Sequence, residues 1–342
     1  MRPSFFHHLH PPTIPADQAR WRYTLGAGGI AIYLALVIFL TGALEMFYYV
    51  ATPQAAALSN QTITFLIPFG KLIRQLHFWA SQALVGVALI HLFRVIYTGA
   101  YAPPRRFNYL LGLFSFLLIL LLDFSGYILR WDDGIRWALV VGTNIIKSIP
   151  WLGDWLYRQV VGGSQPGLPT LTRFYAAHIF TLILGFTGVT IWHIFRVRRD
   201  GGISVPPAGD RPNPHRTPRS VLVYREFVAV LLVSVVLLLL AEFLPAPLAA
   251  PIRSLNTPDP DARAPWFFIW VQGLVRLGDP FWMGVIIPLA VLGFFALIPF
   301  IFPSPAPAER GRWFPRGGRL AQVSATVVAL LIIVLTVWTY FQ

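Results

Sequence analysis

The sequence predicts an all-α protein that crosses a membrane several times. Hydrophobic residues make up 56% of the 342 residues and charged residues only 12%, whereas a soluble domain carries roughly 25% charge. Seven apolar stretches are each close to the ~20 residues that a helix needs to cross the hydrocarbon core. They cover residues 28–50, 77–97, 109–129, 174–195, 221–243, 281–302 and 320–340. We therefore expect seven transmembrane helices.

The segments between these stretches indicate how the chain is organised. Residues 1–22 lack an apolar core followed by a small-residue cleavage site, so they do not resemble a cleaved signal peptide. Two long loops contain apolar stretches, at 149–157 and 266–277, which we expect to form short surface helices or part of a site. A Pro- and Gly-rich segment, 201–218, separates four helices from three, and predicts two regions, 1–205 and 206–342.

The distribution of charge predicts the orientation. The chain has 27 Lys and Arg against 14 Asp and Glu, a net charge of +13. Such a surplus can indicate a nucleic-acid partner, but here the basic residues alternate with apolar stretches, which is typical of membrane flanks. Most of them fall on one side if the N-terminus is cytoplasmic. We therefore expect a multi-pass protein of a bacterial cytoplasmic membrane, with the C-terminus on the opposite face and no nucleic-acid partner.

The absence of cysteine limits the possible chemistry. It excludes structural disulfides, Cys-ligated zinc, iron–sulfur clusters and thioether-attached haem within this chain. The eight histidines are then the only strong soft-metal ligands. His7, His8, His10 and His215 lie in polar segments, and we interpret them as surface residues.

The other four histidines lie in two of the predicted helices. His77 and His91 are 14 residues apart, and His178 and His193 are 15 apart. At ~100° per residue each pair projects from roughly one face, with about 21 Å between the two levels. The two helices run in the same direction, so His77 should lie level with His178 and His91 with His193. Facing imidazoles are what a six-coordinate haem iron requires. The alternative, four independently packed histidines, is disfavoured by the matched pairs, so we expect a four-helix dihaem bundle.

Glycines repeat the same interval in the two neighbouring helices. Gly28 and Gly42 are 14 residues apart, as are Gly112 and Gly126. A residue without a side chain permits the close approach of a flat ring to the backbone. Ordinary small-residue packing between helices is the alternative, but the shared interval favours clearance for haem.

The sequence motifs around these histidines and glycines resemble those of a known family, the cytochrome b subunit of Rieske/cytochrome b complexes. These complexes are quinol:cytochrome c and quinol:plastocyanin oxidoreductases. The resemblance covers nearly the whole chain. The motifs that carry it are Thr41-Gly42, Phe69-Gly70-Lys71-Leu72-Ile73-Arg74, His91-Leu92-Phe93-Arg94, Gly126-Tyr127 before Trp131-Asp132, and Thr172-Arg173-Phe174 before His178. The 15-residue step is similar to the chloroplast and Gram-positive type. The later half resembles the separate subunit IV of that type, here fused to the first half.

The resemblance implies the cofactors, substrate and partners. Two non-covalent b haems are implied, one held by His77 and His178 on the outer side and one by His91 and His193 on the cytoplasmic side. Arg74, Arg94 and Arg173 become candidates to pair with haem propionates; anchoring at the membrane interface is the alternative. Quinone is the implied substrate. A Rieske iron–sulfur protein and a c-type cytochrome are the implied partners, in a homodimer of complexes.

The sequence departs from the family at three places. Gly26 stands where chloroplast-type members carry the cysteine for an extra covalent haem, so no c-type haem is expected here. The outer quinol site of the family carries Pro-Glu-Trp-Tyr, but here Pro265 takes the glutamate position and Phe267 the tyrosine position, on either side of Trp266. Neither Pro265 nor Phe267 can accept a proton. The family's Pro-Trp-Asp reads Arg130-Trp131-Asp132.

Two acids in the predicted spans offer another route for the proton. Glu45 and Asp123 both fall toward the outer half, and charges within the membrane default to functional hypotheses. The hypothesis is that one of them relays the outer-site proton. The alternatives are an ion pair with Arg130, a haem-propionate network, or a protonated acid without a role.

Three functions remain open from the sequence. The first is an enzyme subunit that oxidises quinol and passes electrons between two haems. The second is a non-bifurcating transmembrane electron conduit, fed by a partner such as a multihaem cytochrome. The third is a haem-bearing anchor for peripheral redox subunits, which the four histidines and the arginines disfavour.

Overall fold

The computed structural model describes residues 12–205, 215–252, 255 and 263–342. In these residues seven helices are long and apolar enough to cross a membrane, which confirms the predicted all-α polytopic fold. They are α3 (Ala27–Glu45), α5 (Gly70–Tyr97), α6 (Arg106–Leu129), α9 (Leu168–Ala176) continued through η2 (Ala177–Thr181) into α10 (Leu182–Arg199), α11 (Arg219–Phe243), η4 (Trp282–Ile286) with α13 (Ile287–Ile301), and η5 (Arg316–Gly318) with α14 (Arg319–Tyr340).

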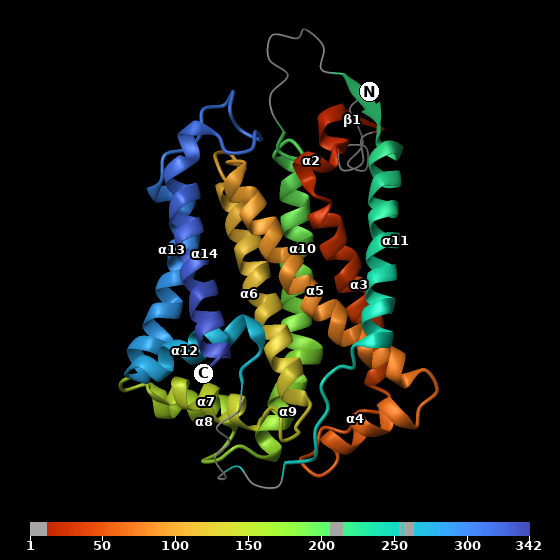
Figure 1. Cartoon of the computed structure of the whole chain (residues 1–342), viewed down its shortest axis with the longest axis vertical. Helices are drawn as coiled ribbons and strands as arrows, with labels where there is room; N and C mark the ends of the chain where they lie inside the picture. Colours follow the sequence, from red (N-terminus) through yellow and green to blue (C-terminus); the bar gives the residue numbers. More distant parts are fainter. Residues whose placement is uncertain (1–11, 206–214, 253–254, 256–262) are drawn as a thin grey trace.

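These helices stand side by side, and β1 and the C-terminus lie at opposite ends of the bundle (Figure 1). We call the end that carries α2 (Trp21–Thr24) the N-terminal end and the other, where α14 finishes, the C-terminal end. At the N-terminal end β1 (Thr13–Pro15) pairs antiparallel with β2 (Arg216–Pro218), and η1 (Ala16–Ala19) follows β1. This pairing ties the start of the described chain to the start of α11.

Short helices cover the C-terminal end of the bundle (Figure 1). They are α4 (Ala56–Phe65), α7 (Arg136–Lys147), α8 (Gly153–Val161), η3 (Trp266–Phe268) and α12 (Ile269–Leu277). The apolar stretches predicted at 149–157 and 266–277 are therefore short helices in large part.

Several helix boundaries differ from the predicted spans; the fourth span, for example, begins at Leu168 rather than residue 174. The second span begins at Gly70 rather than His77, and the first ends at Glu45 rather than residue 50. Gly70 lies against the backbone of α4: a Cβ atom there would fall 1.9 Å from the carbonyl oxygen of Ile63. Only glycine fits at this crossing, which allows α5 to start a full turn and more before the histidine.

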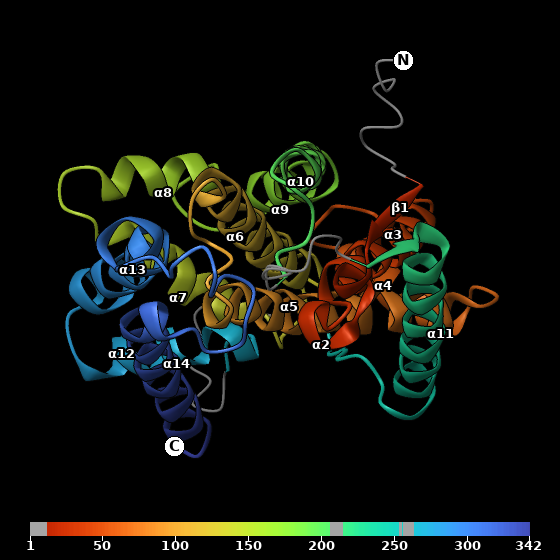
Figure 2. The ribbon, with the colours of Figure 1, turned by 90° about the horizontal axis from the view of Figure 1, so that it is seen from above.

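The helices α3, α5, α6 and α10 form a central bundle around a shared apolar core. Leu34, Leu84, Leu118 and Phe186 contribute one buried side chain from each of them. Figure 2 shows α11 beside α3 on one flank, and α13 and α14 on the other. The later three helices thus pack on two sides of the bundle. The predicted region boundary falls at residues 206–214, outside the described residues, and stays a prediction.

Candidate functional site

The structure brings the four membrane histidines together in two pairs. His77 on α5 faces His178 on η2, with the ring centroids 6.4 Å apart and the ring planes at 65°. His91 on α5 faces His193 on α10, also with 6.4 Å between centroids, and with the planes at 83°. These are the two levels that the residue spacing predicts.

The separation within each pair would leave room for one metal ion between the two imidazoles. A metal–imidazole bond of about 2.0 Å on each side, with about 1.2 Å from each nitrogen to its ring centre, predicts about 6.4 Å between centroids. The two sites therefore fit bis-histidine ligation of haem iron.

Hydrogen bonds determine which nitrogen of His77 carries the proton. The Thr41 hydroxyl lies 3.0 Å from His77 Nδ1 and donates its proton to the carbonyl of Val37, 2.7 Å away. Because that hydroxyl has one proton, it accepts from His77, which must carry its proton on Nδ1. The lone pair on Nε2 is then available to a metal, the arrangement that outer-shell partners impose on ligand histidines.

The histidines of η2 and α10 are held in the same way. His178 Nδ1 lies 2.9 Å from the Ser125 hydroxyl and 3.1 Å from the Leu122 carbonyl, and the Ser125 hydroxyl donates to that same carbonyl. His193 Nδ1 lies 3.1 Å from the carbonyl of Asn108. Carbonyls only accept, so both rings carry their proton on Nδ1. Among the described residues, His91 Nδ1 has no hydrogen-bond partner.

A π-helical turn explains the unequal spacing of the two pairs. The turn η2 spans Ala177–Thr181 and includes His178. A π-turn inserts one extra residue into an α-helix, so the 15 residues between His178 and His193 cover the angle and rise of 14 ordinary helical steps. Both histidines can therefore meet their partners on α5.

The four glycines lie directly against the four imidazoles. A Cβ atom at Gly42 would fall 2.9 Å from Cε1 of His77, one at Gly126 2.8 Å from His178, and one at Gly112 3.1 Å from His193. The corresponding distance from Gly28 to His91 is 3.9 Å. The glycines were expected to clear a flat ring; the structure places the imidazole edge of a histidine against each of them, which explains the shared interval.

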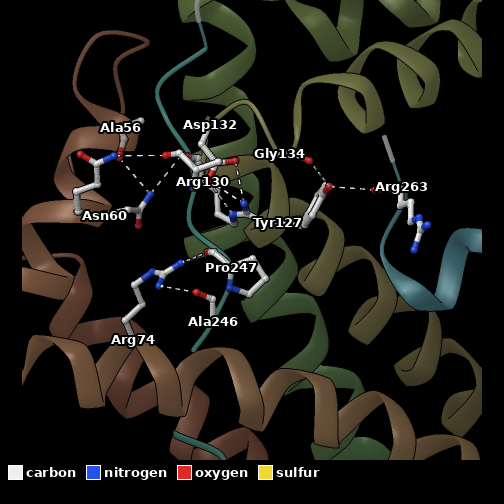
Figure 3. Close-up of polar contacts among 12 residues, drawn as sticks. Ala56, Asn60, Arg74, Tyr127, Arg130, Asp132, Gly134, Ala246, Pro247 and Arg263 are labelled. Atoms are coloured by element: carbon white, nitrogen blue, oxygen red, sulfur yellow. Dashed lines mark hydrogen bonds and ion pairs between the residues drawn. The ribbon is translucent and has the colours of Figure 1, made fainter. Parts of the chain in front are cut away.

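The three candidate arginines bond to backbone carbonyls at the two ends of the bundle. At the C-terminal end Arg74 donates to the carbonyls of Ala246 and Pro247, as Figure 3 shows. Arg173 donates there to the carbonyls of Arg158 and Gln159. At the N-terminal end Arg94 donates to the carbonyls of Tyr23 and Ser204. All three therefore also join loops to the bundle.

Arg130 forms its ion pair with Asp132, not with either membrane acid. The two side chains are 2.8 Å apart and largely buried (Figure 3). Asp132 also accepts the backbone N–H of Ala249 at 3.0 Å. Arg74 and Asp132 thus both bond to the backbone of the same connection, at Ala246, Pro247 and Ala249. Of the alternatives for Glu45 and Asp123, the ion pair with Arg130 is thus not what the structure contains.

Asp123 and Glu45 have different surroundings. The Gln82 amide of α5 donates to both carboxylate oxygens of Asp123, at 3.0 and 3.3 Å, and its own oxygen accepts the Trp266 indole N–H at 2.8 Å. Glu45 Oε1 is buried without a hydrogen-bond partner among the described residues. Sequence reasoning missed Gln82, because no motif distinguishes a glutamine on an apolar helix.

The segment around Trp266 is anchored to several helices. Gln272 Oε1 accepts the backbone N–H of Ala264 at 2.8 Å, and Pro265 precedes the turn η3. Phe267 is buried against the central core, and the Arg263 guanidinium lies over the Tyr340 ring, 4.3 Å from its centroid. The three predicted quinone-site residues are therefore adjacent to the Gln82–Asp123 contact.

The fold and the paired histidines together define a multi-pass membrane protein of the b-type cytochrome class. The family model described as cytochrome b (N-terminal)/b6/petB matches residues 82–251. Cytochrome b6 of Heliobacterium modesticaldum is 34% identical over 192 residues, covering 56% of this chain and 88% of the relative. Cytochrome b6 of Synechococcus elongatus is 34% identical over 174 residues, covering 51% and 81%. The chain therefore belongs to the cytochrome b/b6 family.

A solved structure shares the whole fold. A chain of a hyperthermophilic respiratory Complex III superposes with a TM-score of 0.77 and 23% sequence identity, covering 93% of this chain and 92% of that one. At this identity the likeness shows the fold alone. It covers more of this chain than the b6 relatives, which align to 56% and 51% of it.

Proposed function

We propose that this chain is the dihaem cytochrome b subunit of a membrane quinol:cytochrome c oxidoreductase of the Rieske/cytochrome b type. In this proposal it carries electrons across the membrane between two b haems and two quinone sites. The strongest support is that the four membrane histidines form two pairs, each with 6.4 Å between ring centroids. Membership of the cytochrome b/b6 family supports b-type haem as the cofactor.

Each haem iron, when bound, supplies a one-electron carrier; the protein supplies its position. His77 and His178 would hold one group near the C-terminal end, and His91 and His193 the other near the N-terminal end. Arg74 and Arg173 would face propionates of the first, and Arg94 of the second, because guanidinium groups suit carboxylates. The four glycines of α3 and α6 would let the imidazoles pack close to these helices, in positions from which they could bind the metal. No covalent haem is proposed, since the chain has no cysteine.

At the outer quinone site, formed around Pro265, Trp266 and Phe267, we propose Asp123 rather than Glu45 as the proton acceptor. Oxidation of one quinol releases two electrons and two protons, and neither Pro265 nor Phe267 can take a proton. Asp123 is linked through Gln82 to the Trp266 indole, whereas Glu45 Oε1 has no hydrogen-bond partner among the described residues. One electron would leave to a Rieske iron–sulfur partner and the other to the haem pair.

The remaining parts of the proposal concern organisation. The region from residue 206 onward would correspond to subunit IV, fused to the dihaem region 1–205, and the complex would be a homodimer that also contains a c-type cytochrome. The N-terminal end would face the cytoplasm, since most of the basic residues lie there.

A second function is favoured by one observation. The absence of a titratable residue at positions 265 and 267 also fits a non-bifurcating conduit, in which a partner such as a multihaem cytochrome reduces the haems. A haem-bearing anchor is the least favoured reading.

Haem stoichiometry and quinol-driven reduction test the proposal. Protein purified from membranes should contain two non-covalent haems b per chain, and His91→Ala should remove one while leaving the His77–His178 site loaded. Addition of quinol to the complete complex should reduce cytochrome c, with inhibition by outer-site inhibitors. One haem or none in the wild-type protein would contradict the dihaem assignment. Reduction of the haems only through a partner cytochrome, insensitive to those inhibitors, would favour the conduit.

A further inference from the structure

A polar cavity lies at the N-terminal end, away from both histidine pairs. Its volume is about 250 Å³. Three connections line it: the turn between α5 and α6, the residues after α10, and the loop between α13 and α14. Figure 1 shows these three connections at the same end of the bundle. Gln18 of η1 closes one side, and its amide donates to the carbonyls of Gly201 and Ile203, at 3.2 Å each.

Two guanidinium groups line this cavity from different loops. Arg105 donates one N–H to the carbonyl of Gly202 at 2.7 Å. Arg310 donates to the carbonyls of Pro305 and Pro103, at 3.2 and 2.7 Å. A guanidinium has five N–H donors. Both groups therefore keep several N–H donors without a partner among the described residues, on the wall of a cavity.

The charges around the cavity are unbalanced. Burial lowers the pKa of Arg105, the nearby Asp200 carboxylate raises it, and Arg310 lowers it again. Asp200 is the acid that lines the cavity among the described residues, and it already pairs with Arg196 and Arg199, at 3.2 Å each. It is therefore shared among more cations than it can neutralise. A second anion between Arg105 and Arg310 would offset the repulsion between them.

The other walls indicate the size and kind of anion. The rest of the lining is formed by alanine, proline and glycine residues of the α5–α6 turn, together with Gly201, Ile203, Ser204, Val205 and Pro307. The helix α6 begins at Arg106, immediately after Arg105, so its positive N-terminal end adjoins the cavity. A small group with several oxygens can accept hydrogen bonds from both guanidinium groups at once. The apolar walls suit the carbon atoms of an ester.

We propose that this cavity is a binding site for a phosphate group, held between Arg105 and Arg310. The phosphate of an anionic phospholipid and free inorganic phosphate share this chemistry. The cavity lies where the spans end, at the level of lipid headgroups, and basic pockets at this level bind anionic lipid. The proposal is independent of haem and of quinol oxidation, and it can be tested by binding alone.

The test uses the full chain purified in detergent. Native mass spectrometry would compare retention of phosphatidylglycerol with that of phosphatidylcholine carrying the same acyl chains, with and without inorganic phosphate as competitor. The double variant R105Q/R310Q removes both charges, and R312Q/R316Q, two exposed arginines of the same end, is the matched control. Because glutamine at 105 and 310 also removes bonds to loop carbonyls, a second pair of variants is needed. Ile203→Glu places a carboxylate on the cavity wall and keeps both arginines, and Ile203→Gln is its neutral counterpart.

The expected result is one retained phosphatidylglycerol that is displaced by inorganic phosphate. Its retention should fall at least tenfold in R105Q/R310Q and in Ile203→Glu, but not in Ile203→Gln or R312Q/R316Q. Binding of inorganic phosphate without retention of lipid would support the site with a soluble ligand. Equal retention in wild type and Ile203→Glu, or binding of neither probe by the wild type, would overturn the proposal.

Discussion

Gly126 lies directly against the imidazole of His178: a Cβ atom at this glycine would fall 2.8 Å from Cε1 of the ring. Real Cβ atoms do not approach other carbons so closely, so a side chain here must displace the histidine or separate α6 from η2. The position of His178 thus depends on a residue 52 positions earlier in the chain, through contact alone.

Gly126→Ala is expected to empty the site formed by His77 and His178. Haem content should fall from two toward one per chain, measured by the pyridine haemochrome and by redox difference spectra. Gly188→Ala, also on a membrane span but with nothing within 4 Å of its added Cβ, is the matched control and should keep both haems. Gly28→Ala, at 3.9 Å from His91, should also keep both. Full haem content in Gly126→Ala would show that the ring position is not limiting.

Thr41→Val should weaken the same site without blocking it. The substitution keeps the shape of the side chain but removes the oxygen that lies 3.0 Å from His77 Nδ1. Loss of an outer-shell partner typically reduces metal affinity by about 10- to 100-fold. The rate of haem transfer to an excess of apo acceptor protein should rise accordingly. Thr190→Val is the control, because the Thr190 hydroxyl has no partner among the described residues; equal rates in the two variants would argue against the contact.

Asp123→Asn should slow quinol oxidation while leaving both haems in place. Removal of a positioned proton acceptor typically costs about 10²- to 10⁴-fold in rate. Steady-state cytochrome c reduction over a range of pH measures it, and the haem spectrum reports the fold. Glu45→Gln should remain near the wild-type rate. Wild-type rates for Asp123→Asn at every pH would exclude Asp123 as the acceptor, whatever the haem content.

Asp132→Asn should destabilise the C-terminal end of the bundle. Its partner Arg130 would be left as a charge in a largely buried position, and breaking a buried pair from one side costs about 3–5 kcal/mol. Asp154→Asn breaks a similar but exposed pair with Lys147, which is worth about 0–1 kcal/mol. Thermal unfolding in detergent should separate the two variants; similar transition temperatures would mean that the Arg130–Asp132 pair is not a major contribution.

Much of the fold could be predicted because the membrane constrains local sequence. A span must be about 20 apolar residues long and helical, so α3, α5, α6, α10, α11, α13 and α14 are each visible as a stretch of residues. The short helix α4 (Ala56–Phe65) was not predicted, because its sequence includes Ser59, Asn60 and Gln61. A helix that packs on the end of the bundle does not need the continuous apolar sequence of a membrane span.

The histidine levels were also predictable, because two helices that run in the same direction keep equal intervals level. The cause of the unequal interval was not. The 15-residue step on the fourth span suggested a rotation, and the structure instead contains a π-turn at His178. No residue type marks a π-turn, since it results from how the helix packs.

The sequence by itself determined the number of spans, the pairing of the histidines and the absence of cysteine chemistry, because each follows from local composition or from fixed helical geometry. Tertiary structure decided which residues contact the histidines and the buried acids. Thr41 and Ser125 contact imidazoles on neighbouring helices. Gln82 hydrogen-bonds to both Asp123 and Trp266, and Arg130 forms an ion pair with Asp132. These contacts depend on how each helix is rotated about its axis and on where the loops pack against the bundle. Neither can be read from the residue periodicity of a single helix.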